Sequence, residues 1–442
     1  MGVIDKRSLR LAFRDKRSGK GWFEFYRQPC VICGHVGNCM IFEDQKTVVC
    51  TRQASDIVFS KENLSYVHRL DGEIKLTGKT DIHTSRKKFD DHILSHFFYE
   101  LIKDSTTKIK PEHIEHFAEK RGISEETIAI RGYCSYPEKP WETAKNVLGQ
   151  FGSHDTFLKG SQGIPGFYLD QYNNWTMVRH DGILIPYRDR FNQVIGFQIR
   201  YDNPPNMVAV DALNYPGLQA KVKQQPNLVQ VFDNGVVIAE LEMKLNQRLE
   251  FKSGDKRGFV QLKKGQRYMW LSSANRKEGT QAGGMDSPLP VHVSVPSNEL
   301  KQNNLLIEEH KDSSQHGVAI KTKSIWLTEG ALKADLAIDH IVNAYADEID
   351  EVGKVMLAVP GVNTWRRILP LIEEMGVERI NVAFDMDAAE NPDVQKHYIE
   401  MVQYLRENYQ VYIALWPLDK AKGIDDCLNM SLKPILRKVQ SI

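Results

Sequence analysis

Two groups of side chains in this sequence have types and spacings that suit metal ions. Four of the six cysteines lie between Cys30 and Cys50. Far downstream, one apolar run ends at Glu329, and a later one ends at Asp385 and Asp387. Clustered thiolates favour zinc, whereas grouped carboxylates favour Mg²⁺. The sequence therefore predicts two metal centres of different chemistry.

The cysteine cluster predicts one closed, structural zinc site. Disulfides rarely persist in cytosolic proteins, so closely spaced thiols favour a metal. Four thiolates complete a tetrahedral shell, whereas a catalytic zinc needs an open position. His35 is an alternative ligand to Cys39, and we favour the all-cysteine set because four thiols already saturate the ion. The expected ligands follow the pattern Cys30-x2-Cys33-x5-Cys39-x10-Cys50.

The acidic residues predict a magnesium site because of where they fall on the predicted strands. Glu329 closes one strand, and Asp385 and Asp387 close another. The carboxyl ends of parallel strands share one edge of a sheet, so these carboxylates are expected to converge. They would repel one another unless divalent cations neutralised them. Asp425 and Asp426 are further candidate ligands, and their alternative role is to cap the last helix.

These residues require several structural parts to position them. Residues 22–50 predict short strands and tight turns around the cysteines. Helices are expected to begin near Asp91, Pro111 and Ser124, from apolar spacing and capping residues. Strands and turns follow, with a β-rich insertion at about 203–266. Beyond this region strand and helix alternate, which predicts a parallel sheet with right-handed crossovers.

The fold class expected is multidomain, of mixed α+β and α/β type. A chain of 442 residues is long enough for two to four domains. The expected order is a small β zinc-ribbon-like module at 1–72, a linker at 73–90, a mixed α+β basic subdomain at 91–300 that contains the insertion, a linker at 301–320, and a parallel α/β domain with a C-terminal helix at 321–442.

Composition and charge restrict the class of protein. The chain is 41% hydrophobic and 26% charged, which is ordinary for a soluble globular protein. It has no run of 18 apolar residues and no apolar N-terminal signal, so we expect a cytoplasmic protein without a membrane partner. Residues 1–30 hold eight Lys or Arg against three Asp or Glu, and residues 341–400 hold five against twelve. This asymmetry suits a polyanion at one end and divalent cations at the other.

Several motifs together resemble those of a known family. Thr328-Glu329-Gly330-x2-Lys333-Ala334 with Phe384-Asp385-x-Asp387 resembles the TOPRIM domain of primases and topoisomerases. The cysteine segment, with Val49-Cys50-x-Arg52 and Tyr66-Val67-His68-Arg69-Leu70, resembles the zinc module of plasmid- and phage-type DNA primases. The resemblance covers most of residues 25–430, in the order found in the family.

The middle of the chain extends the resemblance to the RNA-polymerase domain of these primases. Its opening helical segment, basic core and polar strand are similar to Arg121-Gly122-Ile123-Ser124-x-Glu126-x-Ile128, to Ile185-Pro186-Tyr187-Arg188-Asp189 through Gly196-Phe197-x-x-Arg200, and to Arg267-Tyr268-x-Trp270-Leu271-Ser272-Ser273. Two features depart from the bacterial replicative primase. That enzyme usually has a histidine among its zinc ligands, and it carries an acid where this chain has Lys333.

The resemblance implies a DNA primase that makes short RNA primers on single-stranded DNA for a plasmid, phage or other mobile element. Glu329, Asp385 and Asp387 would be catalytic and hold Mg²⁺ or Mn²⁺, while the zinc would be structural. The residues expected to contact template or nucleotide are Arg52, Arg188, Arg200, Lys277 and Lys333. The expected partners are single-stranded DNA and nucleoside triphosphates. A helicase would be a separate protein, because the chain has no Gly-x4-Gly-Lys-Ser/Thr element.

Two alternatives to primer synthesis remain open at this point. Another TOPRIM enzyme, such as a nuclease, would use the same acids. A non-catalytic adaptor would bind single-stranded DNA and recruit a separate helicase.

Overall fold

The chain divides into two compact units, which are described separately. The computed structural model describes residues 3–440 except 16, 27, 35–36, 61–64, 78–87, 152–162, 216, 275, 283–288, 310–317 and 386–391. Unit 1 comprises Met1–Thr84 and Asn203–Arg267, and unit 2 comprises Ser85–Asp202 and Tyr268–Ile442. The insertion predicted at about 203–266 therefore forms one unit with the zinc-binding segment.

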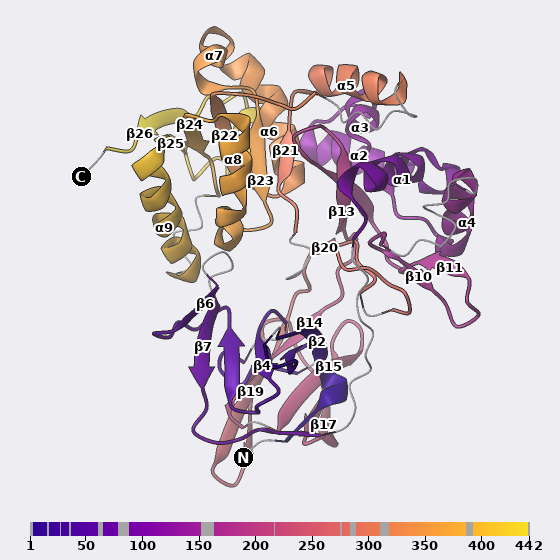
Figure 1. Cartoon of the computed structure of the whole chain (residues 1–442), viewed down its shortest axis with the longest axis vertical. Helices are drawn as coiled ribbons and strands as arrows, with labels where there is room; N and C mark the ends of the chain where they lie inside the picture. Colours follow the sequence, from indigo (N-terminus) through magenta and orange to yellow (C-terminus); the bar gives the residue numbers. More distant parts are fainter. Residues whose placement is uncertain are drawn as a thin grey trace. The chain divides into compact units, whose positions relative to one another are not determined.

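The N-terminal part of unit 1 is a six-stranded antiparallel sheet in the order β2-β3-β4-β5-β7-β6 (Figure 1). Its strands are β2 (Arg10–Arg14), β3 (Gly21–Glu24), β4 (Met40–Phe42), β5 (Thr47–Cys50), β6 (Val58–Ser60) and β7 (Ser65–Arg69). Trp22, Phe23 and Phe25 are all buried. These aromatic side chains form the core of the small module, which leaves them unavailable for stacking on bases.

A parallel strand pair lies within the first part of the predicted linker at 73–90. Strand β8 (Lys75–Thr77) pairs with β1 (Val3–Asp5). Ile74 is buried, and the Leu76 amide donates to Gln45 Oε1 at 3.0 Å. These tertiary contacts order a polar segment that has no apolar periodicity of its own. Residues 78–87 of that segment lie outside the described part of the chain.

The insertion is a β structure with its own core. Two three-stranded sheets, β14-β19-β18 and β15-β16-β17, enclose a buried cluster that includes Tyr215, Leu218, Val231 and Val260. The strands are β14 (Met207–Asn214), β15 (Leu218–Gln224), β16 (Leu228–Asp233), β17 (Val236–Glu242), β18 (Arg248–Ser253) and β19 (Lys256–Lys263). The insertion contacts the zinc-binding segment where Gln219 Nε2 donates to Gln28 Oε1 at 2.8 Å.

Unit 2 begins with helices that pack on an antiparallel sheet. The sheet has the order β20-β13-β12-β9, and α1 buries Phe97, Phe98 and Leu101 against it. The predicted helix starts are confirmed: α1 spans Asp91–Lys103, α2 Pro111–Arg121 and α3 Glu125–Arg131. The other elements of this region are β9 (Cys134–Ser135), α4 (Pro140–Gln150), β10 (Phe167–Leu169), β11 (Trp175–Met177), β12 (Ile183–Arg188), β13 (Val194–Arg200) and β20 (Tyr268–Trp270).

The C-terminal part of unit 2 is a six-stranded sheet in the order β21-β23-β22-β24-β25-β26 (Figure 1). The four central strands are parallel, and the outer strands β21 and β26 are antiparallel to their neighbours. The elements are β21 (His292–Ser294), β22 (Ser324–Glu329), α6 (Ala331–Ala344), α7 (Ile349–Val352), β23 (Met356–Val359), α8 (Leu369–Met375), β24 (Arg379–Val382), α9 (Pro392–Asn408), β25 (Gln410–Leu415), α10 (Ile424–Asn429) and β26 (Ile435–Lys438).

Alternation along β22 explains why helices cover both faces of this sheet. Ile325 and Leu327 belong to a core shared with α8 and α9, whereas Trp326 belongs to a core shared with α6 and α10. Successive strand residues point to opposite faces, so a continuous apolar run buries both. The predicted fold class, a multidomain chain of mixed α+β and α/β type, is confirmed.

The linker predicted at 301–320 is wrong over its first part, because helix α5 spans Ser297–Glu309. The start of α5 is held by Asp339 on α6, which accepts hydrogen bonds from the backbone amide and hydroxyl of Ser297 at 2.6 and 2.5 Å. Leu300 is buried in the core of the parallel sheet. A partner residue distant in sequence thus caps a helix whose own signals are weak. Within the described part of the chain, no helix is long and apolar enough to cross a membrane.

Candidate functional site

The candidate site lies where the connections of the parallel sheet diverge. From β22 the chain passes through α6, on one face, to β23. From β23 it passes through α8, on the other face, to β24 on the opposite side of β22. Ligands of open α/β sheets bind outside the carboxyl ends of the strands at such a switch point. Glu329 ends β22, and Asp385 follows β24 three residues after its last residue.

Lys333 brings the two strand ends together. Its ammonium forms an ion pair with Asp385, and its Nζ lies 3.9 Å from Glu329 Oε1. The side chains of Lys333 and Asp385 are 16% and 13% exposed, and that of Glu329 is 37% exposed. Lys333 lies in the first turn of α6, four residues after Glu329 at the end of β22, and its contacts place it at the same strand edge. Asp335, two residues further along α6, pairs with Arg131 instead.

The carboxylates of α10 lie at the same place. A Cβ on Gly423, which precedes α10, would stand 2.5 Å from Asp425 Oδ1, 3.2 Å from Asp385 Oδ1 and 3.4 Å from Lys333 Cε. Asp425 is thus close to both the acid and the base of the strand edge. Asp426, on the same turn, is 44% exposed at its side chain. Asp387, the remaining predicted ligand, lies outside the described residues.

Arg121, at the end of α2, completes the group of charges. Its Nη1 donates to Asp425 Oδ2 at 2.8 Å and lies 3.7 Å from Asp426 Oδ1. Burial raises the pKa of Asp425, Lys333 and Arg121 lower it, and the nearby Asp426 and Asp385 raise it, with a net upward shift. A buried carboxylate beside two others favours a bound cation. The oxygen donors of Glu329, Asp385 and Asp425 therefore fit a hard divalent ion such as Mg²⁺.

The predicted phosphate-binding residues fall into two classes of exposure. Arg188 and Arg200 are 3% and 5% exposed. Arg188 donates to Tyr99 Oη at 2.7 Å and to the carbonyl of Asn192 at 3.0 Å, so it braces β12 from within. Lys277 and Arg52 are exposed. Of the five predicted residues, only these last two are exposed, and the Lys333 side chain at the strand edge is 16% exposed.

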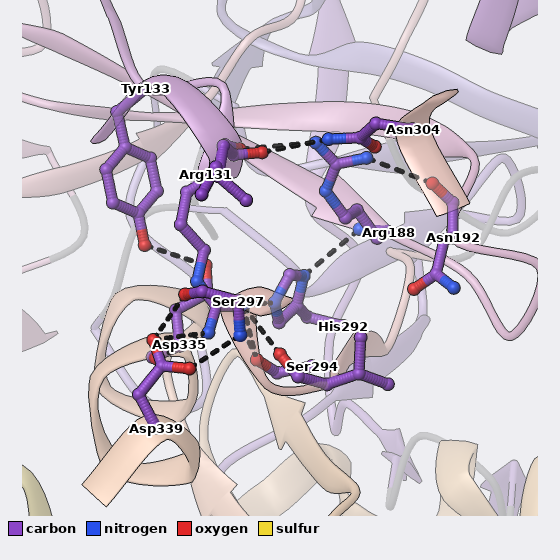
Figure 2. Close-up of polar contacts among 12 residues, drawn as sticks. Arg131, Tyr133, Arg188, Asn192, His292, Ser294, Ser297, Asn304, Asp335 and Asp339 are labelled. Atoms are coloured by element: carbon purple, nitrogen blue, oxygen red, sulfur yellow. Dashed lines mark hydrogen bonds and ion pairs between the residues drawn. The ribbon is translucent and has the colours of Figure 1, made fainter. Parts of the chain in front are cut away.

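A second network, buried except at Asp339, surrounds Arg131 and Asp335 (Figure 2). Arg131 donates from Nη1 to Asp335 Oδ1 at 2.8 Å and from Nη2 to Asp339 Oδ2 at 2.9 Å. Tyr133 Oη donates to Asp335 Oδ2 at 2.7 Å. His292 accepts the Arg188 amide at Nδ1, so its ring hydrogen is on Nε2, which faces Asp335 Oδ1 at 3.1 Å. The network joins α3, β21 and α6, and it fixes the helix that carries Lys333.

The sequence did not indicate Arg121 or Arg131 as partners of the site. Arg131 is paired with a residue 204 positions away, and Arg121 with one 304 positions away. Both arginines occupy the last turn of a helix that ends at a glycine with positive φ. A basic residue there is ordinarily explained by the helix dipole, so its tertiary role had no local signal.

The four predicted thiols form the second site, in unit 1. The sulfur atoms of Cys30, Cys33, Cys39 and Cys50 all lie within 4.8 Å of one another. Cys39 Sγ lies 3.7 Å from Cys33 Sγ and 3.8 Å from Cys50 Sγ. A tetrahedron with Zn–S bonds of ~2.3 Å has sulfur–sulfur edges of about 3.8 Å. These separations match a zinc shell, and His35, the alternative ligand, lies outside the described residues.

The surroundings of the thiols also suit a metal. The amides of Arg52 and Gln53 donate to Cys50 Sγ at 3.4 and 3.3 Å, and the Ile32 amide donates to Cys30 Sγ at 3.4 Å. Hydrogen bonding from Cys30 lowers the pKa of Cys50 to about 6, whereas hydrogen bonding with Cys33 raises the pKa of Cys30. The protein alone therefore supports charge on some of these thiols at the expense of others. A divalent cation allows all of them to be thiolates.

Comparisons with known proteins give structural neighbours only. No protein family model matches the chain, and no curated protein matches it in sequence. The Aquifex aeolicus primase, solved with its zinc-binding and RNA polymerase domains, is 11% identical, with 94% of this chain and 77% of that chain covered and a TM-score of 0.38. The RNA polymerase domain of Mycobacterium tuberculosis primase DnaG, in complex with double-stranded DNA, is 11% identical, with 77% and 80% covered and a TM-score of 0.39. The E. coli primase catalytic core is 13% identical, with 78% and 76% covered and a TM-score of 0.34. These three solved structures contain primase catalytic cores or RNA polymerase domains, in one case together with the zinc-binding domain.

Proposed function

We propose that this chain is a DNA primase that joins ribonucleotides on a single-stranded DNA template by metal-dependent nucleotidyl transfer. The observation that carries the proposal is the convergence of Glu329, Asp385 and Asp425 around Lys333 at the switch point of the parallel sheet. The motif order over residues 25–430, including the TOPRIM-like acids, supports the same reading.

The acids would hold Mg²⁺ or Mn²⁺. Glu329, Asp385 and Asp387 are the proposed ligands, and Asp425 and Asp426 would complete the set. Bound metal would supply positive charge to the transferring phosphate and lower the pKa of the attacking 3′ hydroxyl. The chain itself positions these carboxylates on neighbouring strand ends and keeps Lys333 among them as a donor of hydrogen bonds to phosphate oxygens.

The remaining parts would bind the template and the nucleotide. Arg52, exposed beside the thiol cluster, and Lys277, exposed in unit 2, are proposed to contact phosphates. The zinc would be structural, because four thiolates leave no open position. We assign the chain to a plasmid, phage or other mobile element and expect a separate helicase, on the motif resemblance alone.

A primer-synthesis assay tests the proposal. The zinc-loaded protein is incubated with single-stranded DNA, ribonucleotides and Mg²⁺ or Mn²⁺, and short products are resolved on a denaturing gel. We expect the wild type to make them and Asp385→Asn to lose them at least a hundredfold. Glu378→Gln is the matched control, because Glu378 is exposed and precedes the same strand at its other end.

The alternative functions give different results in the same experiment. A nuclease would cleave the DNA in the absence of nucleotides, with the same dependence on Asp385. A non-catalytic adaptor would bind single-stranded DNA without metal and give no product with any nucleotide mixture. Full synthesis by Asp385→Asn would refute the assignment of the acids.

A further inference from the structure

Lys333 occupies a place in the acid cluster that an ion could otherwise take. Its ammonium contacts Asp385 from one strand end and lies 3.9 Å from Glu329 Oε1 of the neighbouring strand end. Its side chain is 16% exposed, so most of it is withdrawn from water. An ammonium has three hydrogen-bond donors and a compact charge. It thus neutralises two carboxylates in the way a bridging cation would.

The loop before α10 closes this side of the cluster. A Cβ on Gly423 would stand 3.4 Å from Lys333 Cε and 3.2 Å from Asp385 Oδ1. The backbone of Gly423 is therefore packed directly over the lysine–aspartate pair. The ammonium is enclosed among the acids, and the more exposed carboxylate is that of Glu329, at 37%.

The charges of the described side chains balance with one divalent ion. Glu329, Asp385, Asp425 and Asp426 contribute four negative charges, and Lys333 and Arg121 contribute two positive charges. The group carries a net charge of about −2 at neutral pH. One Mg²⁺ offsets the charge of these described side chains, and Asp387, which lies outside the described residues, is not counted.

We propose that the Lys333 ammonium takes the place of one metal ion of a paired-metal centre, so that this site binds a single divalent cation. The inference rests on the proposed function, because it concerns the same acids. Paired-metal sites stabilise both the attacking and the leaving oxygens of a displacement. Here the second positive charge is covalently fixed on α6, and the buried network around Asp335, two residues further along that helix, holds it in position.

The number of bound metal ions tests the proposal without measuring activity. Zinc-loaded full-length protein is titrated with Mn²⁺, and free Mn²⁺ is followed by electron paramagnetic resonance in the absence of DNA and nucleotides. We expect one Mn²⁺ for the wild type. Lys333→Met should still bind one, at least about tenfold more tightly, because a positive charge that contacts the same carboxylates is removed. Lys333→Glu should bind two.

A matched control and a folding check accompany the titration. Lys323→Met removes a lysine whose side chain is 80% exposed in the same domain, and it should leave both number and affinity unchanged. Circular dichroism melts report whether each variant is folded. If Lys333→Glu fails to fold, the affinity of Lys333→Met for Mn²⁺ tests the proposal.

The outcomes separate this inference from the proposed function. Two Mn²⁺ on the wild type, or an unchanged affinity in folded Lys333→Met, would overturn the role of the lysine and leave the metal site standing. Absence of Mn²⁺ binding from the wild type and all variants, or binding that Asp385→Asn does not weaken, would overturn the metal site itself and the inference with it.

Discussion

The buried pair between Arg131 and Asp335 gives a quantitative prediction about what holds α6 in place. Asp335 has a side chain that is 4% exposed, and it is surrounded by four donor groups. The donors are Arg131 Nη1 at 2.8 Å, Tyr133 Oη at 2.7 Å, His292 Nε2 at 3.1 Å and Ser294 Oγ at 2.5 Å. Asp335→Asn keeps the shape of the side chain and removes the charge that compensates Arg131.

The expected cost follows from the burial of both partners. Removing one member of a buried ion pair costs about 3–5 kcal/mol, because the other charge stays buried without compensation. Asp339 remains 2.9 Å from Arg131 Nη2, and its side chain is 30% exposed, so part of the compensation persists. We therefore expect about 3 kcal/mol in the free energy of unfolding of unit 2. With a urea m-value of about 3 kcal/mol/M, the midpoint falls by about 1 M.

Tryptophan fluorescence during urea unfolding measures this shift. Trp326 and Trp365 are fully buried in the two cores of the parallel sheet, so they report on the element that the network fixes. Glu126→Gln is the control, since Glu126 pairs with Lys301 at an exposed site and should change the free energy by less than about 0.5 kcal/mol. The expected fall in the urea midpoint of Asp335→Asn is roughly 1 M, so a midpoint within about 0.3 M of wild type would refute the reasoning.

The pH dependence of the same pair has a defined sign. Burial raises the pKa of Asp335, but Arg131 and then His292 lower it by more, and the net pKa is well below the ordinary value. A depressed folded pKa stabilises the folded state above the unfolded pKa of about 3.9 and ceases to do so as the pH falls through the folded pKa. The difference between wild type and Asp335→Asn should therefore be full at pH 7 and shrink below about pH 4.

Three further predictions concern other sites. Burial raises the pKa of Asp189 to about 6, although hydrogen bonds from the amides of Gln193 and Phe191 oppose the shift. A carboxyl group with a raised pKa in the folded state lowers stability above that pH. Asp189→Asn should therefore stabilise the protein by up to about 3 kcal/mol at pH 8 and by nothing at pH 4, as measured by urea unfolding at both pH values. Cys39→Ser, or chelation of the zinc, should unfold the small module, seen as a red shift of Trp22 fluorescence, because the metal supplies its folding energy; an unshifted spectrum after verified zinc loss would contradict a structural role. Gly423→Ala should weaken Mn²⁺ binding roughly tenfold with little change in melting temperature, because the new methyl group would stand 2.5 Å from Asp425 Oδ1. Unchanged Mn²⁺ binding would show that the loop before α10 does not pack on the acids.

Features set by local chemistry could be predicted from the sequence. Helix α1 begins and ends where its apolar spacing does, and α2 ends at Gly122, whose φ is 65°. Cys30 and Cys33 lie in a turn closed by a hydrogen bond from the Gly34 amide to the Cys30 carbonyl at 2.8 Å, as knuckle spacing requires. Such signals act over a few residues, so they can be read without knowledge of the tertiary structure.

Features set by contacts with residues distant in the sequence could not be predicted in this way. Helix α5 was predicted as a linker because its capping acid, Asp339, lies on another helix. Arg188 was expected at the template from its charge, yet the structure buries it against Tyr99 and backbone carbonyls. Residue type alone does not distinguish an exposed cation from an internal brace. The convergence of Asp425 with Asp385 likewise depends on how the loop before α10 returns to the strand edge.

The central claim is that Glu329, Asp385 and their neighbours carry templated nucleotidyl transfer. It is tested most directly by sequencing the products that the wild type and Asp385→Asn make from ribonucleotides on a defined single-stranded template with Mg²⁺. We predict short products complementary to the template from the wild type, and none from Asp385→Asn under conditions where both bind the template equally. Equal yields of complementary product from the two proteins would contradict the account.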